Sequence, residues 1–187
     1  MRIILASLMV LAACAPAPSQ QEGPPRVVEP RPFTGPARRD DALLKQVMLA
    51  RHNAARAAVG VAPLVWNDAL AADALAYAEQ MARTGRFAHA PQPQGPGRQG
   101  ENLWTGTRGA YRYAEMIDAW IAEKRWFTNG VVPAFSTTGN YEDVAHYTQI
   151  IWRGTRAVGC ALASNAHDDY LVCRYAPPGN VVGQKAL

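Results

Sequence analysis

The chain has 187 residues, enough for one ordinary domain with additional length. Hydrophobic residues make up 49% and charged residues 18%, a composition that excludes a chain disordered throughout. The net charge of +4 is concentrated at the N-terminus: residues 1–39 carry five arginines and two glutamates, whereas residues 40–187 carry 14 Lys and Arg against 13 Asp and Glu. A nearly neutral domain argues against nucleic acid as a partner.

The N-terminal segment has the succession of residue types that is typical of an export signal. Arg2 precedes an apolar run over residues 3–13 that is too short to span a bilayer. The run ends in Leu-Ala-Ala-Cys14, and small residues before a cysteine are typical of a bacterial lipoprotein, whose cysteine is lipidated and becomes the first mature residue. We therefore predict a signal peptide over residues 1–13 and lipidation of Cys14. The alternative is an ordinary cleaved signal with an incidental cysteine.

Residues 14–39 are predicted to tether the domain to a membrane. Seven of them are prolines and few are large and apolar, so the segment cannot bury enough surface to offset the entropy of ordering. Ala15 rather than aspartate follows Cys14, which favours the outer membrane. The predicted location is the cell envelope, as an outer-membrane lipoprotein or a periplasmic or extracellular protein.

Hydrophobic periodicity and turn residues predict the elements of residues 40–187. A first helix runs from Asp40 to about Ala58, and a second begins after Asn67 or Asp68 and ends at Gly85. Further predictions, in chain order, are a short apolar link at 64–66, a loop at 87–100, a helix at 111–124, a loop at 128–141, and strands at 157–164 and 170–175 joined by a turn. Helices first and paired strands late indicate an α+β domain with a small antiparallel sheet.

Cys160 and Cys173 are the only cysteines after Cys14. They fall on the two adjacent predicted strands, and export places them in an oxidising compartment, so we predict a disulfide between them. In the loop-entropy description such a bond contributes about 3 kcal/mol of stability. A free nucleophilic thiol is the alternative.

Seven segments together resemble the CAP superfamily, which includes plant pathogenesis-related 1 proteins, cysteine-rich secretory proteins and venom allergen 5. They occur in the family's order across residues 43–183: His52-Asn-Ala-Ala-Arg, Pro63-Leu-Val-Trp-Asn, Gly100-Glu-Asn-Leu-Trp, Trp120-Ile-Ala-Glu, His146-Tyr-Thr-Gln-Ile-Ile-Trp, Gly159-Cys-Ala, and Val172-Cys-Arg-Tyr-Ala-Pro-Pro-Gly-Asn-Val. The resemblance implies an α-β-α sandwich with a small, mainly antiparallel sheet over residues 40–187.

The resemblance also implies a cleft in which two histidines and two glutamates meet. The matching residues are His89, Glu101, Glu123 and His146. Imidazole and carboxylate are suitable ligands for Zn²⁺, and without a metal a His–Glu pair can hold a polar ligand or activate water. A buried polar network that only fixes loops to the core is the structural alternative.

Three functions remain open from the sequence. The favoured one is a lipid-anchored binding module of the envelope that takes a small hydrophobic ligand or an envelope or host protein, with a divalent-metal cleft. The second is a metal- or glutamate-assisted hydrolase of peptide or glycan bonds, in which Glu101 or Glu123 is the catalytic base. The third is a scaffold without a working cleft.

Other polar and aromatic residues receive more limited predictions. Asn102 and Trp104 directly follow Glu101 and are candidates to line the cleft. Family members are similar in carrying a lipid-binding loop between the positions of Glu123 and His146, and the aromatic candidates there are Phe127, Phe135 and Tyr141. His52 is predicted to pack within the first helix, and His167 to be solvated in the hairpin turn.

Overall fold

The structure, a computed structural model, describes residues 35–187. The predicted signal peptide, Cys14 and most of the predicted tether lie outside these residues. Among the described residues, Ala37 is buried and its N–H donates to Gly109 O at 2.8 Å.

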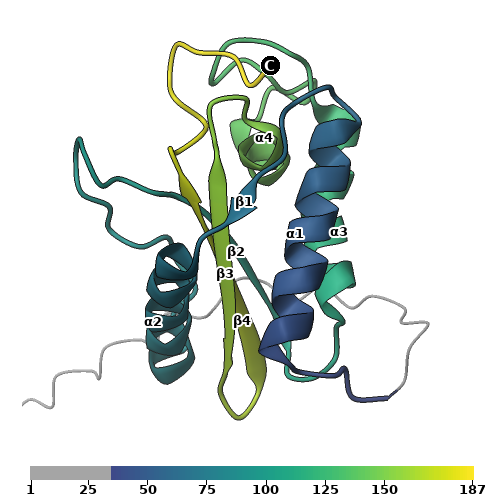
Figure 1. Ribbon diagram of the computed structural model, residues 1–187, viewed down its shortest axis with the longest axis vertical. Helices are drawn as coiled ribbons and strands as arrows, with labels where there is room; N and C mark the ends of the chain where they lie inside the picture. The colour runs from purple at the N-terminus through teal and green to yellow at the C-terminus, as the bar shows by residue number, and fades with distance from the viewer. Residues whose placement is uncertain (1–34) are drawn as a thin grey trace, which may run out of the picture.

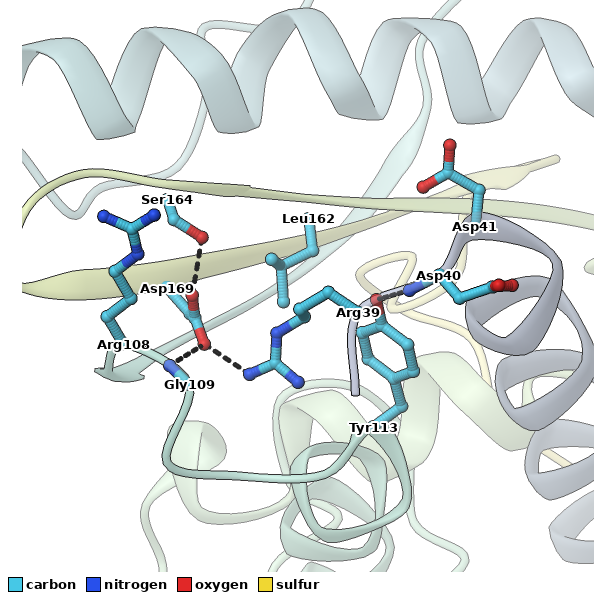
Figure 2. A pocket seen from close by; sticks show the side chains of 9 residues that line it. All are labelled: Arg39, Asp40, Asp41, Arg108, Gly109, Tyr113, Leu162, Ser164 and Asp169. Atoms are coloured by element: carbon cyan, nitrogen blue, oxygen red, sulfur yellow. Dashed lines mark hydrogen bonds and ion pairs between the residues drawn. The ribbon is translucent and has the colours of Figure 1, made fainter. Parts of the chain in front are cut away.

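Arg39 attaches this N-terminal segment to Asp169, at one end of the sheet (Figure 2). Its guanidinium pairs with the carboxylate of Asp169, whose side chain is 1% exposed. The same carboxylate accepts hydrogen bonds from Gly109 N–H at 2.9 Å and from Ser164 Oγ at 2.6 Å. Asp40 N–H donates to the Tyr113 hydroxyl, so the chain enters its first helix in a fixed direction.

Two long helices begin and end at the residues that the sequence indicates. Helix α1, Asp41–Ala57, is capped by Asp40, which accepts from Leu43 N–H. Helix α2, Asp68–Thr84, is capped by Asn67 and ends at Gly85, whose φ of 67° is the left-handed conformation that glycine adopts without strain. Every fourth residue of α1 from Leu44 to Arg56 is buried, so this helix presents one continuous stripe to the core.

The sheet has four strands in the order β1-β3-β4-β2. These are β1 Val65–Trp66, β2 Gly100–Thr107, β3 Ala157–Ser164 and β4 Asp168–Ala176. Only the β1–β3 pair is parallel; β3–β4 and β4–β2 are antiparallel. The predicted hairpin is confirmed, whereas β2 was not predicted, and the apolar link at 64–66 contributes an edge strand.

The helices cover both faces of the sheet (Figure 1). Helix α2 packs on one face, and α1, α3 (Tyr113–Ala122) and α4 (Ala145–Ile151) lie on the other. Short 3-10 turns follow α3 at Glu123–Trp126 and precede α4 at Tyr141–Val144. The predicted α+β sandwich is therefore confirmed, with α4 as a helix that the sequence patterns had not indicated.

One feature links two strands of the sheet, and another lets a helix pack closely on it. Cys160 and Cys173 are register partners on β3 and β4 and form the predicted disulfide. At Gly159 a Cβ atom would lie 2.2 Å from Ala71 N and 2.5 Å from Asn67 O. Glycine at this position therefore lets the first turn of α2 pack directly against the sheet.

No helix within residues 35–187 is both long enough and apolar enough to span a bilayer.

Candidate functional site

The first half of the predicted cleft is a pair between His89 and Glu101. His89 lies in the loop between α2 and β2, and Glu101 lies near the start of β2. Nδ1 of His89 is 2.6 Å from Oε1 of Glu101, and the same oxygen accepts the N–H of Ala90 at 3.0 Å. Because a carboxylate only accepts, this contact places the ring proton on Nδ1. The His89 side chain is 67% exposed and that of Glu101 only 5%.

Arg174 completes this pair, and sequence reasoning did not single it out. It is the register partner of Glu101 on β4, and its guanidinium nitrogen lies 2.9 Å from Oε2 of Glu101. The guanidinium also lies over the Tyr77 ring of α2, 5.3 Å from the ring centre. Burial raises the pKa of the Tyr77 hydroxyl, and the charge of Glu101 raises it further. A lone arginine within an apolar strand was the available signal, since such a charge needs a buried partner.

The second half is a pair between Glu123 and His146. Glu123 follows the end of α3, and His146 lies in the first turn of α4. Nδ1 of His146 is 2.6 Å from Oε1 of Glu123, while Oε2 accepts the N–H groups of His146 and Tyr147, each at 3.1 Å. The imidazole also stacks on Trp120, with ring centres 5.7 Å apart. Both carboxylates therefore bind a histidine through Nδ1 and leave Nε2 as the ring nitrogen with an open acceptor position.

Asn102 connects the two pairs. It follows Glu101 on β2 and is 1% exposed. Its side-chain amide donates to the backbone oxygen of His146 and to the Tyr175 hydroxyl, each at 3.1 Å. Within the described residues no hydrogen bond or ion pair joins one His–Glu pair directly to the other. The structure therefore arranges the four predicted residues as two His–Glu pairs, and Asn102, which follows Glu101 in the chain, links them through its hydrogen bond to the His146 backbone.

The donor set does not form a metal centre of the usual kind. No group of three or more His, Cys, Asp or Glu side chains that could hold a metal ion occurs in residues 35–187. Glu101 is engaged by an imidazole, a backbone N–H and a guanidinium, and Glu123 by an imidazole and two backbone N–H groups. The side chains therefore do not fit a zinc site with three protein ligands. Only the two imidazole Nε2 atoms remain available to coordinate a metal ion.

The other predicted residues lie in different surroundings. Trp104 is partly buried and packs edge-on against Tyr111, with ring centres 5.0 Å apart. Phe135 is fully buried, whereas Phe127 and Tyr141 are partly exposed. Burial therefore makes Phe135 a core residue, and only Phe127 and Tyr141 retain accessible surface for a lipid.

The two remaining histidines are confirmed in their predicted roles. His52 is fully buried in α1; its Nδ1 lies 2.7 Å from Met48 O and its Nε2 lies 2.9 Å from the Tyr175 hydroxyl. Burial lowers its pKa to about 4. His167 is exposed in the β3–β4 turn. Neither contributes to the candidate site.

The chain is similar to known proteins over most of its length. The family model described as CAP, the cysteine-rich secretory protein family, matches residues 49–175. The chain belongs to this family. Pathogenesis-related protein 1C of Nicotiana tabacum is 38% identical over 141 residues, which cover 75% of this chain and 79% of that protein. All four predicted cleft residues of this CAP domain lie within the matched range.

Solved structures show the same fold at lower identity. BmVAL-1 superposes on the CAP domain with a TM-score of 0.65 at 21% identity, covering 82% of this chain and 86% of that one. NaASP2, whose crystal structure is described as containing Zn²⁺, gives a TM-score of 0.64 at 23% identity and covers 76% and 84%. At these identities the likeness supports the fold, and the zinc belongs to that protein.

Proposed function

We propose that this CAP-domain chain is an exported binding module of the cell envelope that contacts its ligand through the imidazoles of His89 and His146. The difference in exposure within each pair carries this proposal. The carboxylates of Glu101 and Glu123 are 5% and 19% exposed, whereas their imidazole partners are 67% and 31% exposed. Buried carboxylates that fix accessible imidazoles are suited to holding a ligand, because the rings are oriented before it arrives.

The ligand class follows from what the imidazoles can accept. Each Nε2 accepts a hydrogen bond from a hydroxyl or amide group, and the partly exposed aromatic residues nearby, Trp126 and Phe127, add apolar surface. We propose a small hydrophobic molecule with a polar end, or an exposed segment of an envelope or host protein.

A divalent metal is a further proposed occupant of the same surface. In this proposal the two Nε2 atoms supply two ligands and water supplies the others, so the metal is exchangeable rather than a resident cofactor. No step of the proposed function depends on it.

Native mass spectrometry of the full chain, purified from membranes without chelator and then titrated with Zn²⁺, tests these proposals. A bound molecule or zinc should appear in the wild type and be lost in His89→Ala/His146→Ala. His167→Ala is the matched control, because it removes an exposed imidazole outside the site. A mass without adducts that Zn²⁺ leaves unchanged would contradict both occupants.

The hydrolase alternative has less support from the geometry. Glu101 and Glu123 each accept several hydrogen bonds, so neither carboxylate is free to take a proton from water. Incubation with peptide and glycan substrates, comparing wild type with Glu101→Gln, decides between the two. Turnover that Glu101→Gln abolishes in a folded protein would favour the enzyme over the binding module.

We also propose that Cys14 carries the lipid that holds the module at the membrane. Its lipidation rests on the sequence signal alone, since Cys14 lies outside the described residues. Cys14→Ser should move the protein from the membrane fraction to the soluble fraction after cell lysis. Retention of Cys14→Ser in the membrane fraction would contradict the anchor.

A further inference from the structure

A cavity of about 330 Å³ lies beside the candidate site, between α2 and the loop that precedes β2. Asp73, Tyr77 and Gln80 line it from α2, and their spacing places them on one side of the helix. The loop is held over the cavity by Gln99, whose amide donates to Asp73 Oδ2 at 2.6 Å. None of the four predicted cleft residues lines this cavity.

Arg174 lines the inner side of the cavity and links it to Glu101. Their side chains are 6% and 5% exposed, so the pair is buried. Oε2 of Glu101 is paired with a terminal guanidinium nitrogen of Arg174 at 2.9 Å, whereas Nε of Arg174 has no acceptor within the described residues. A buried donor is thus left unsatisfied beside a paired carboxylate, which is unfavourable unless a further group accepts a hydrogen bond from it.

A hydroxyl group matches this requirement, since it accepts from a guanidinium N–H and donates to a carboxylate oxygen at the same time. An anionic ligand would meet the carboxylate of Asp73, and a cationic ligand would meet the guanidinium of Arg174. Because Nε of Arg174 is buried, the Arg174 side chain must rotate for this contact to form. The charges therefore select a neutral ligand that carries hydroxyl groups.

The other residues that line the cavity are also suited to a neutral ligand with hydroxyl groups. The side-chain amides of Gln80 and Gln92 each offer donors and an acceptor, as hydroxyl groups require. Tyr77, Pro91 and Pro93 add flat apolar surfaces between them. Sugar rings combine hydroxyl groups at their edges with apolar C–H faces. The hydroxyl groups would bond to the glutamine amides, and the C–H faces would pack against the tyrosine and proline rings.

We propose that the cavity between α2 and residues 91–99 binds a neutral saccharide of one or two rings. The site is separate from the imidazole surface of the proposed function and adjoins it through the Arg174–Glu101 ion pair. Occupancy would orient Arg174 and, through Glu101, hold His89 more firmly.

Isothermal titration of the full chain with glucose and N-acetylglucosamine tests the proposal, with glucuronate and glucosamine as charged counterparts of similar size. The neutral sugars should bind saturably and more tightly than either charged sugar. Gln80→Ala should weaken this binding about three- to tenfold, as the loss of one hydrogen bond predicts. Gln46→Ala, which removes the same side chain from an exposed position on α1, should leave it unchanged.

Other outcomes would overturn the proposal or relocate the site. No saturable binding of a neutral sugar, or tighter binding of glucuronate, would overturn it. Equal binding by Gln80→Ala and wild type would also overturn it. His146→Ala separates this site from the imidazole surface: unchanged saccharide binding supports the separate cavity, whereas its loss would place the sugar at the imidazoles and contradict the inference.

Discussion

The carboxylate of Glu123 binds His146 through the ring and the backbone at once. Oε1 lies 2.6 Å from Nδ1 of the imidazole, and Oε2 accepts the backbone N–H of the same residue at 3.1 Å. The ring is also stacked on Trp120 with an interplanar angle of 11°. One acidic side chain therefore fixes both the start of α4 and the orientation of the imidazole that the proposed function uses.

Removing this carboxylate should destabilise the domain. Glu123→Ala leaves the N–H groups of His146 and Tyr147 without an acceptor at the N-terminus of α4, so we expect a loss of about 1–3 kcal/mol in the free energy of unfolding. Urea denaturation followed by circular dichroism measures it. Glu142→Ala, an exposed acidic residue before the same helix, is the control and should change stability by less than about 0.5 kcal/mol. Equal losses in both variants would contradict the capping role.

His52 should make stability depend on pH. Its folded-state pKa is lowered to about 4 by burial, below the ordinary value of 6.5. Between these values the unfolded chain binds the proton and the folded one does not, so stability falls as the pH falls from about 6.5 to 4. The shift corresponds to a loss of at most about 3 kcal/mol across this window.

Denaturation midpoints measured from pH 7 to pH 4 check this dependence. His52→Gln should flatten the slope relative to wild type, because it removes the group that titrates differently in the two states. Gln46→Ala, which removes an exposed side chain that does not titrate from the same helix, should leave the slope as it is. Parallel slopes for wild type and His52→Gln would show that other groups cause the pH dependence.

Arg56 should be among the most sensitive positions of the fold. It is fully buried and donates to the backbone oxygens of four residues, Ala62, Ile150, Trp152 and Thr155. Burial lowers its pKa to about 10, so the guanidinium stays charged at neutral pH. A lysine cannot reach four carbonyl groups from one nitrogen, and Arg56→Lys should cost about 3–5 kcal/mol.

Thermal unfolding of Arg56→Lys measures this cost. Arg51→Lys is the matched control on the same helix, where the arginine is half exposed and lies 3.6 Å from Asp118. A surface ion pair contributes little, so the midpoint of this control should be close to that of wild type. A midpoint for Arg56→Lys near that of the control would mean that the carbonyl network is dispensable.

The disulfide should stabilise the hairpin by restricting the unfolded chain. It joins residues separated by 13 positions, for which loop closure predicts about 3 kcal/mol. Cys160→Ala/Cys173→Ala should lower the urea midpoint accordingly, and adding a reductant to wild type should give a similar shift. A midpoint that neither treatment changes would contradict this contribution.

Substitutions at Phe135 and Phe127 should distinguish an effect on folding from an effect on lipid binding. Phe135 is fully buried, so Phe135→Ala should cost about 3–5 kcal/mol through the cavity it creates. Phe127 is partly exposed beside Tyr147, and Phe127→Ala should leave the domain folded. Uptake of a fluorescent fatty acid by Phe127→Ala tests the lipid hypothesis: reduced uptake supports it, and unchanged uptake removes it.

Local patterns were sufficient for the long elements of this fold. The caps at Asp40 and Asn67 and the glycine at position 85 define α1 and α2 within a residue, because they act on backbone groups only a few positions away. The hairpin and its disulfide were likewise predictable from alternating apolar residues and two cysteines. The four cleft residues were located by resemblance to the family rather than by spacing.

Only the tertiary structure determined the remaining elements. Strand β2 follows a loop rich in glycine and proline and forms because it pairs along its whole length with β4. Helix α4 has seven residues, too few to be stable alone, and it depends on the carboxylate of Glu123 at its start. Both depend on partners far away in sequence, which a local pattern does not contain.

The sequence by itself determined which residues form the two long helices, the hairpin and the His–Glu set. The tertiary structure decided how those residues pair: each histidine with one glutamate, Arg174 with Glu101, and Asn102 between the two pairs. The physical reason is that charges and amides within a protein interior must find partners across the fold, and those partners are set by strand register and helix packing rather than by neighbours in the chain.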